Sequence, residues 1–212
     1  MSEPVSGNKF ELQRREKLDK IRRLGIDPYG QRMDGIEPAE AVKAAYEEGR
    51  RVRCAGRIVL LRDIGKLIFI TLRDAGGTIQ LGLSKNQMQA QWELVKLLEL
   101  GDLIAAEGPL GKTKTGEITI WGESVSLMAK SLEQPPEKFH GLSDVDARYR
   151  MRFVDLWANP DVMQRFQRRS VMTAAIRRFL TEKGFLEVET PMMQTIAGGA
   201  AARPFITHHN TL

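Results

Sequence analysis

Cysteine is almost absent from this sequence of 212 residues, which contains only Cys54. A single thiol excludes an internal disulfide framework and a cysteine-rich zinc site, and it favours a reducing compartment. No apolar run approaches the roughly 20 residues that span a bilayer, and the first residues lack the apolar core of a signal peptide. We therefore expect a cytoplasmic protein that is neither exported nor inserted into a membrane.

Histidine is also scarce, with three residues in the chain. His208 and His209 are adjacent, so their side chains would point in opposite directions on a strand, and His140 lies far from them in sequence. No Ser/His/Asp or Cys/His set has supporting spacing, and the simplest role for Glu187 and Glu189, on one face of a short expected strand, is structural. We expect no metal site and no catalytic residue within this chain.

Positive charge is in modest excess: 32 Lys and Arg against 27 Asp and Glu give a net charge of +5, which suits a polyanionic partner without requiring one. Residues 9–24 predict a helix that ends at Gly25. Its apolar face is expected to contain Phe10, Leu12, Leu18, Ile21 and Leu24. The opposite face is basic, with Lys9, Arg14, Arg15, Lys17, Lys20, Arg22 and Arg23. That face either contacts phosphates or is the solvated side of an ordinary amphipathic helix.

From residue 51 to residue 131 the pattern changes to short β-branched or alternating runs separated by Gly- and Asp-rich turns. These runs predict five strands, with one helix over residues 85–102 between the third and the fourth. This order of elements matches the small, partly open Greek-key barrel of the OB-fold, which binds oligonucleotides on the face of its second and third strands.

Two side chains on that face are suited to nucleic acid. Alternation along the second and third strands allows Phe69 and Gln80 to point outward from the same face. An aromatic ring can stack on a base and an amide can hydrogen-bond to a base edge, although a phenylalanine on a strand is more often part of the core.

The segment "GPLGKTKTG" superficially resembles a phosphate-binding loop. Only Pro109 and Leu110 separate Gly108 from Gly111, where four residues are needed, and the segment leads into an alternating strand rather than a helix. We expect a basic hairpin tip instead, with Lys112, Lys114 and Glu117 facing a nucleic-acid loop or only water.

A linker with two adjacent prolines covers residues 132–147. Beyond it, the pattern predicts a basic segment, a long helix over residues 162–183 closed by Gly184, and a strand over residues 185–191. Pro191 lacks a donor for a strand ladder, so we expect it at an edge or at a strand end that faces another surface. The glycines and alanines at 198–202 form either a backbone that a small ligand can approach closely or a flexible connection.

Several segments together resemble the N-terminal part of bacterial class II lysyl-tRNA synthetases along essentially the whole chain. They are, in order, "RREKLDKIRRLGIDPY", "LRDAGG", "KTKTGE", "DARYRMRFVDL" and "FLEVETPMMQTIAGGAAARPFITHHN". The resemblance implies a helical extension at 1–50, an anticodon-binding OB-fold barrel at 51–131, a linker at 132–147 and the start of an antiparallel α/β catalytic domain at 148–212. The fold class would therefore be α+β, with an all-β barrel in its first part.

The resemblance also implies roles for individual residues. Phe69 would stack on an anticodon base and Gln80 would hydrogen-bond to the central uridine, while Arg62 and Glu117 match further anticodon contacts. Residues 162–191 resemble the first class II motif, which builds a homodimer interface and has Pro191 as its characteristic proline. Gly198 matches a backbone contact to the lysine substrate, although Ala197 replaces the proline that many relatives have before it.

The implied function is ATP-dependent attachment of lysine to its cognate tRNA, with the anticodon stem-loop, lysine and ATP as ligands of the full-length homodimer. By the same resemblance, the residues that hold ATP and Mg²⁺ would follow position 212, so we expect a fragment that cannot form aminoacyl-adenylate alone. Two alternatives remain: a related synthetase for aspartate or asparagine, and a non-catalytic OB-fold protein that binds tRNA or single-stranded nucleic acid.

Overall fold

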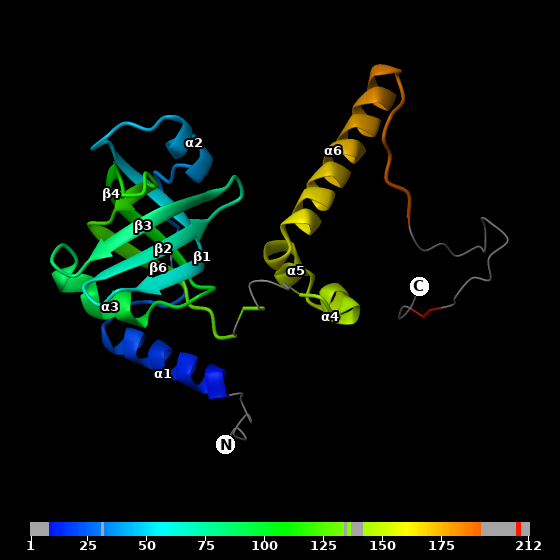
Figure 1. Cartoon of the computed structure of the whole chain (residues 1–212). Coiled ribbons are helices and arrows are strands. Elements are labelled where there is room, and N and C mark those ends of the chain that lie inside the picture. Colours follow the sequence, from blue (N-terminus) through cyan, green and yellow to red (C-terminus); the bar gives the residue numbers. More distant parts are fainter. Residues whose placement is uncertain (1–8, 31, 134, 137–141, 192–206, 209–212) are drawn as a thin grey trace. The chain divides into compact units, whose positions relative to one another are not determined.

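The computed structural model describes residues 9–30, 32–133, 135–136, 142–191 and 207–208 (Figure 1). The chain divides into two compact units, residues 1–137 and residues 138–212. No helix among the described residues is long and apolar enough to cross a membrane.

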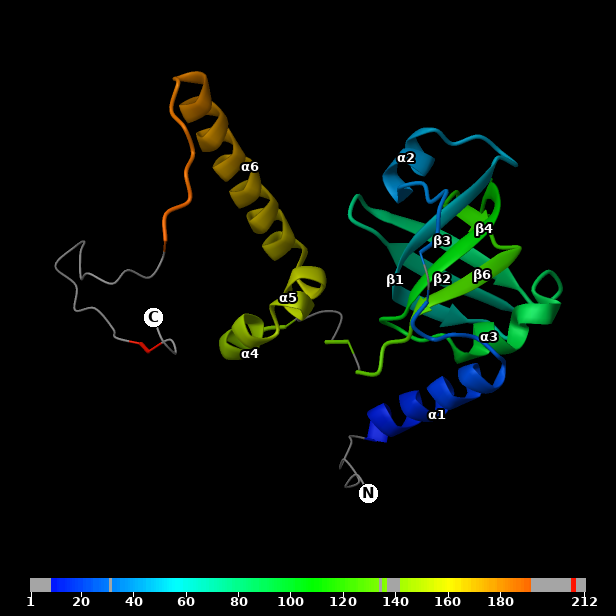
Figure 2. The same cartoon turned by 180° about the vertical axis from the view of Figure 1, so that it is seen from behind.

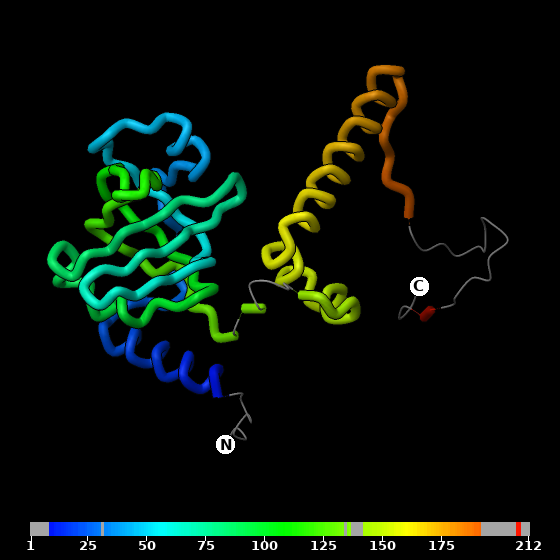
Figure 3. The backbone as a smooth tube through the Cα atoms, in the orientation of Figure 1, coloured from blue at the N-terminus to red at the C-terminus, as the bar shows by residue number. Residues whose placement is uncertain are grey.

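A closed barrel forms the first unit. Its strands are β1 (Arg51–Asp63), β2 (Leu67–Arg73), β3 (Thr78–Ser84), β4 (Leu103–Lys112), β5 (Ile118–Trp121) and β6 (Ser124–Ala129). Antiparallel pairs join β1 to β2, β2 to β3, β4 to β5 and β1 to β4, and a parallel pair between β3 and β5 closes a ring of five strands. The backbone trace in Figure 3 shows the strands wound around one core. The predicted OB-fold barrel is confirmed.

A sixth strand differs from the prediction. The last expected strand is divided at Gly122 and Glu123 into β5, which belongs to the ring, and β6, which pairs only with β4. A Cβ atom on Gly122 would lie 2.5 Å from the Leu83 side chain, so a larger residue at this turn would require a buried core side chain to shift.

Strict alternation produces the barrel core. Along β2, Ile68, Ile70 and Leu72 are buried, whereas the residues between them are only partly buried. Matching inward positions on β3, β4 and β5 hold Leu81, Ile104 and Ile120, all fully buried. Because successive side chains of a strand point to opposite faces, the same pattern directs Phe69, Thr71 and Arg73 outward.

Short helices close the ends of the barrel. Figures 1 and 2 show α1 (Lys9–Arg23) at one end and α2 (Ala39–Ala44) at the other. The helix expected over residues 85–102 is shorter, a 3₁₀ turn at Gln89–Gln91 followed by α3 (Trp92–Leu97). The Gln91 side chain accepts a hydrogen bond from the Val125 amide (2.9 Å) and donates one to its carbonyl (3.1 Å), which fastens this turn to β6.

The buried face of α1 agrees only in part with the expected one. Arg14, Leu18 and Ile21 are buried, whereas Phe10 and Leu12 are half exposed. The Arg14 guanidinium donates hydrogen bonds to the backbone carbonyls of Leu100 and Ser131, each 3.0 Å away. The prediction is confirmed for Leu18 and Ile21 and wrong for Arg14, because a guanidinium that satisfies two orphan carbonyls can be buried.

A buried ionic cluster supports this docking. The Lys130 ammonium is fully buried and contacts Asp102 at 3.0 Å and Glu99 at 2.7 Å, while Lys17 of α1 reaches Glu99 at 2.9 Å. Burial raises the pKa of the Asp102 carboxyl, although Lys130 and two backbone amides oppose that effect. Two residues of the basic face, for which phosphate contact or solvation was expected, therefore hold α1 on the barrel: Arg14 and Lys17.

Three helices make up most of the described second unit: α4 (Val145–Arg150), α5 (Arg152–Ala158) and α6 (Pro160–Glu182). Asp144 caps α4 by accepting a hydrogen bond from the Ala147 amide (2.7 Å), and Gly184 follows α6 with a φ of 85°. The long predicted helix is confirmed. The strand predicted over residues 185–191 is not, because that segment has no strand partner among the described residues.

The motif "DARYRMRFVDL" is explained by one buried carboxylate. Asp155 is fully buried and receives ion pairs from Arg148 (2.9 Å) and Arg152 and a hydrogen bond from the Asn159 amide (2.7 Å). Burial alone would raise its pKa, but the hydrogen bonds from Asn159 and Arg148 and the nearby positive charges outweigh burial and lower the pKa. The motif therefore clamps α4, α5 and the start of α6 together.

Candidate nucleic-acid interface

The outer surface of β1, β2 and β3 brings three predicted residues into one area. Arg62 of β1 is the Cα partner of Phe69 on β2, and Phe69 is in turn the partner of Gly82 on β3. Gln80 lies two residues before Gly82 and faces Thr71. Directly paired residues share a face, so Arg62, Phe69 and Gln80 occupy neighbouring outward positions.

Phe69 has an aromatic neighbour that the sequence analysis missed. The rings of Phe69 and Trp121 meet edge to face, with centroids 6.2 Å apart and an interplanar angle of 65°. Trp121 covers Gly82, where a Cβ atom would lie only 2.8 Å from the indole. Trp121 therefore supports one side of Phe69, which remains partly exposed.

Gln80 is held by the strand that closes the barrel. In the parallel β3–β5 pair its Cα partner is Thr119, whose hydroxyl donates a hydrogen bond to Gln80 Oε1 at 2.7 Å. The same hydroxyl lies 3.1 Å from the carbonyl oxygen of Glu117. Gln80 Nε2 has no hydrogen bond within the described part of the chain, so it is available to a ligand.

Arg62 supplies positive charge at the exposed end of β1. Its guanidinium has no ion pair or hydrogen bond among the described residues, and its side chain is exposed. The neighbouring Asp63 is paired with Lys96 at 2.7 Å, and this hydrogen bond lowers the pKa of the Asp63 carboxyl. Because the Asp63 carboxylate is already paired with Lys96, the Arg62 guanidinium can contact a phosphate.

Glu117 lies on the hairpin between β4 and β5. The Thr113 amide donates to the Glu117 carbonyl (3.0 Å), and the Glu117 amide donates to the Thr113 hydroxyl (3.1 Å). The Glu117 side chain is 51% exposed and lies 3.7 Å from Lys43 of α2. The expected hairpin tip is confirmed. The Glu117 carbonyl contacts the Thr119 hydroxyl, which in turn contacts the side-chain amide of Gln80.

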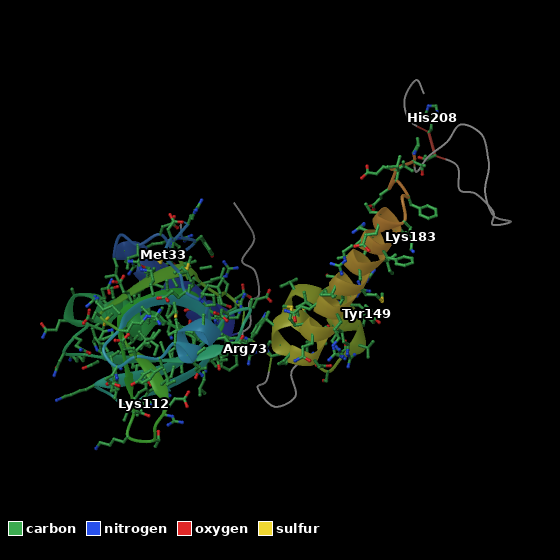
Figure 4. All side chains as sticks on the ribbon, turned by 90° about the horizontal axis from the view of Figure 1, so that it is seen from above. Met33, Arg73, Lys112, Tyr149, Lys183 and His208 are labelled. Atoms are coloured by element: carbon green, nitrogen blue, oxygen red, sulfur yellow. The ribbon has the colours of Figure 1, made fainter. Side chains whose placement is uncertain are left out.

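Basic residues border this area. Lys112, labelled in Figure 4, ends β4 and places its ammonium 4.8 Å from the centre of the Tyr46 ring, while Arg73 ends β2. The phosphate-loop interpretation of "GPLGKTKTG" is excluded by the structure, because residues 108–112 belong to β4 and the following residues to a hairpin turn.

The remaining predicted residues lie in the second unit. Pro191 is exposed at the end of the described extended segment, and Gly198, His140 and His209 lie outside the described residues. His208 is exposed. No three His, Cys, Asp or Glu side chains come together among the described residues in a way that would hold a metal ion.

The barrel thiol, Cys54, is buried, and burial raises its pKa to about 12, which makes it a poor nucleophile.

Helix α6 exposes an apolar surface. Among its residues only Val162 is buried, and the exposed large apolar side chains include Val171, Met172, Ile176, Phe179 and Leu180. A shallow hollow lies along the helix beside Gln164, Gln167, Arg168, Val171 and Met172. Folded proteins seldom leave large apolar patches exposed unless the patch is an interaction site. The surface of α6 is therefore suited to packing against another protein surface.

Two family models match the chain. Residues 52–133 match an OB-fold nucleic acid binding domain, and residues 144–212 match tRNA synthetases class II (D, K and N). The first match covers the barrel, and the second covers the three-helix unit.

Curated relatives match nearly the whole chain. Lysine–tRNA ligase of Carboxydothermus hydrogenoformans is 47% identical over 97% of this chain, and that of Pelotomaculum thermopropionicum is 48% identical over 97%. The enzyme of Dehalococcoides mccartyi is 47% identical over 96%. The chain spans 43%, 41% and 43% of the length of these three relatives. The chain is therefore similar to lysine–tRNA ligases, which are class II synthetases, and it matches the N-terminal part of these relatives.

Proposed function

We propose that this chain supplies tRNA recognition to a lysine–tRNA ligase, which attaches lysine to its cognate tRNA with the use of ATP. The observation that supports this proposal most strongly is the strand register, which places Arg62, Phe69 and Gln80 side by side on the outer surface of the barrel. The proposed ligand of that surface is the anticodon stem-loop.

Each residue of the surface has a distinct physical role. Phe69, supported by Trp121, offers a ring on which an unstacked base can stack, and Gln80 offers an amide for the edge of the next base. Arg62 attracts the phosphate backbone, and Glu117 accepts hydrogen bonds from a base. Sequence-independent affinity from α1 comes from its exposed basic residues, which include Lys20 and Arg23.

The second unit has a different proposed role. The similarity to class II synthetases implies ATP and Mg²⁺ in general for the full-length enzyme. We assign α6 and Pro191 to a homodimer interface, because α6 exposes its apolar residues. Gly198 is assigned to the backbone that contacts lysine. The proposed domains are 1–50, 51–131, 132–147 and 148–212.

Binding of anticodon stem-loop RNA to the 212-residue chain tests the main proposal. Phe69→Ala should weaken binding by roughly tenfold or more, because stacking contributes about 1–3 kcal/mol per base. Gln80→Ala should weaken binding selectively for loops with the preferred central base, by about 1–3 kcal/mol. The control is Gln87→Ala, which removes an exposed amide from the turn after β3.

The alternatives predict different results in the same assay. A ligase for aspartate or asparagine would prefer loops carrying the corresponding anticodons over a lysine anticodon. A non-catalytic binding protein would bind single-stranded RNA without anticodon preference. If Phe69→Ala and Gln80→Ala bind like the wild type, the proposed surface is wrong. The lysine assignment itself is favoured by the matches to lysine–tRNA ligases.

A further inference from the structure

Thr119 is a buried hydroxyl in contact with two residues of the proposed RNA surface. Its side chain is fully buried on β5, and its hydroxyl lies 2.7 Å from Gln80 Oε1 and 3.1 Å from the Glu117 carbonyl oxygen. A buried hydroxyl needs hydrogen-bond partners, and both of these partners come from residues assigned to the anticodon.

The single proton of this hydroxyl has consequences for Gln80. A threonine hydroxyl donates one hydrogen bond, and both nearby oxygens are acceptors. The structure places Gln80 Oε1, and not Nε2, against this hydroxyl at 2.7 Å, so the hydroxyl donates to the amide oxygen and that oxygen faces β5. Gln80 Nε2 is then turned away from Thr119 and has no hydrogen bond among the described residues. The side chain thus presents N–H donors to a ligand.

Amide orientation decides which base is favoured. At ring position 4, uracil has a carbonyl oxygen that accepts a hydrogen bond, whereas cytosine has an amino group that donates one. Thymine and cytosine in DNA differ in the same way. An outward-facing NH₂ group can donate to the uracil carbonyl but opposes the cytosine amino group. The opposite amide orientation would present oxygen and favour cytosine.

We propose that Thr119 is a positioning residue that fixes the amide orientation of Gln80 and thereby sets the preference for uracil over cytosine at the base Gln80 contacts. The inference rests on the proposed function, because it needs an RNA loop at the outer surface of β2 and β3. Thr119 acts through Gln80 and does not itself touch RNA.

The test uses anticodon stem-loop RNAs that carry either U or C at the central position, titrated into the 212-residue chain by fluorescence anisotropy. The wild type should bind the U loop about tenfold or more tightly than the C loop. Thr119→Val, which keeps the shape and removes the hydroxyl, should reduce this ratio roughly three- to tenfold. Thr119→Ser should retain the ratio, because it keeps the hydroxyl.

Thr113→Val is the matched control. It removes a hydroxyl that also contacts the Glu117 backbone, from the same hairpin, but does not touch Gln80. The ratio should be unchanged in this variant. If thermal unfolding shows that the Thr119→Val variant is unfolded, Thr119→Ala replaces it as the variant that lacks the hydroxyl.

The possible outcomes distinguish a failure of the Thr119 role from a failure of the proposed function of Gln80. If Gln80→Ala lowers the ratio but Thr119→Val and Thr119→Ala keep it, only the inference is wrong. Equal weakening of both loops by the Thr119 variants also overturns it, since that pattern indicates a merely structural role. If Gln80→Ala leaves the ratio unchanged, the proposed function of Gln80 and the inference both fail. In the Gln80→Ala background, Thr119→Val should have no further effect on the ratio.

Discussion

The barrel buries its large apolar residues, whereas helix α6 leaves most of its own exposed. In the barrel, large side chains from every strand meet in one closed core, and what remains outside is mainly polar or aromatic. In α6, Phe179 is 58% exposed and Ile176 is 52% exposed. The barrel thus has its own core beneath the proposed RNA surface, whereas the apolar residues of α6 are exposed and are proposed to be covered by a second copy of the chain. The difference separates the region proposed for recognition from the region proposed for assembly.

The largest expected effect compares two isoleucines. Ile120 is fully buried in β5 and Ile176 is half exposed on α6. Ile120→Ala should lower the free energy of unfolding of the barrel by about 2–5 kcal/mol, because it leaves a cavity. Ile176→Ala should change the stability of the isolated chain by only about 0.5 kcal/mol. Urea unfolding followed by circular dichroism measures both changes, and alkylation of the buried Cys54 thiol reports the opening of the barrel separately.

The same position on α6 tests the proposed assembly. Ile176→Asp should weaken self-association without unfolding the barrel, because it introduces a charge into an apolar contact. Sedimentation velocity over a range of protein concentrations is the measurement. The homodimer assignment is wrong if the wild-type chain sediments as a monomer at every concentration, or if Ile176→Asp associates as the wild type does.

A smaller effect is expected from the clamp of the second unit. Asp155→Asn should destabilise α4, α5 and the start of α6 by about 2–3 kcal/mol, because two arginines lose their buried partner. Asp146→Asn, which removes an exposed ion pair with Arg150, is the control and should cost about 0.5 kcal/mol or less.

Acid titration sharpens this comparison. The folded-state pKa of Asp155 is lowered, so its contribution to stability is present above the ordinary carboxyl pKa of about 4 and is lost as the pH falls through the folded value. Thermal unfolding followed by circular dichroism at decreasing pH should show this loss in the wild type. The Asp155→Asn variant should show less of it, and identical profiles would contradict the assigned role of the clamp.

Local patterns predicted much of this structure. Alternation placed Ile68, Ile70 and Leu72 inward and Phe69 outward, and glycines marked the ends of α1 and α6. The contributions of Thr119 and Trp121 were missed, because they depend on the parallel pairing of β3 with β5, two strands that are distant in sequence. The register of such a pair is not encoded in the periodicity of either strand.

Other differences arise from interactions with the rest of the fold. Arg14 was placed on a basic face that either contacts phosphates or is solvated, but its guanidinium donates to two backbone carbonyls that no apolar residue could satisfy. The segment from Phe185 to Pro191 has strand-forming residues, yet a strand requires a hydrogen-bonded neighbour, and the described residues offer none.

Mapping of backbone amide chemical shifts during titration of the labelled 212-residue chain with an anticodon stem-loop tests the central claim most directly. The account predicts that the largest changes occur at Arg62, Phe69, Gln80 and the segment from Glu117 to Trp121, with little change along α6. Changes centred on α6, or none on β2 and β3 at saturating RNA, would contradict it.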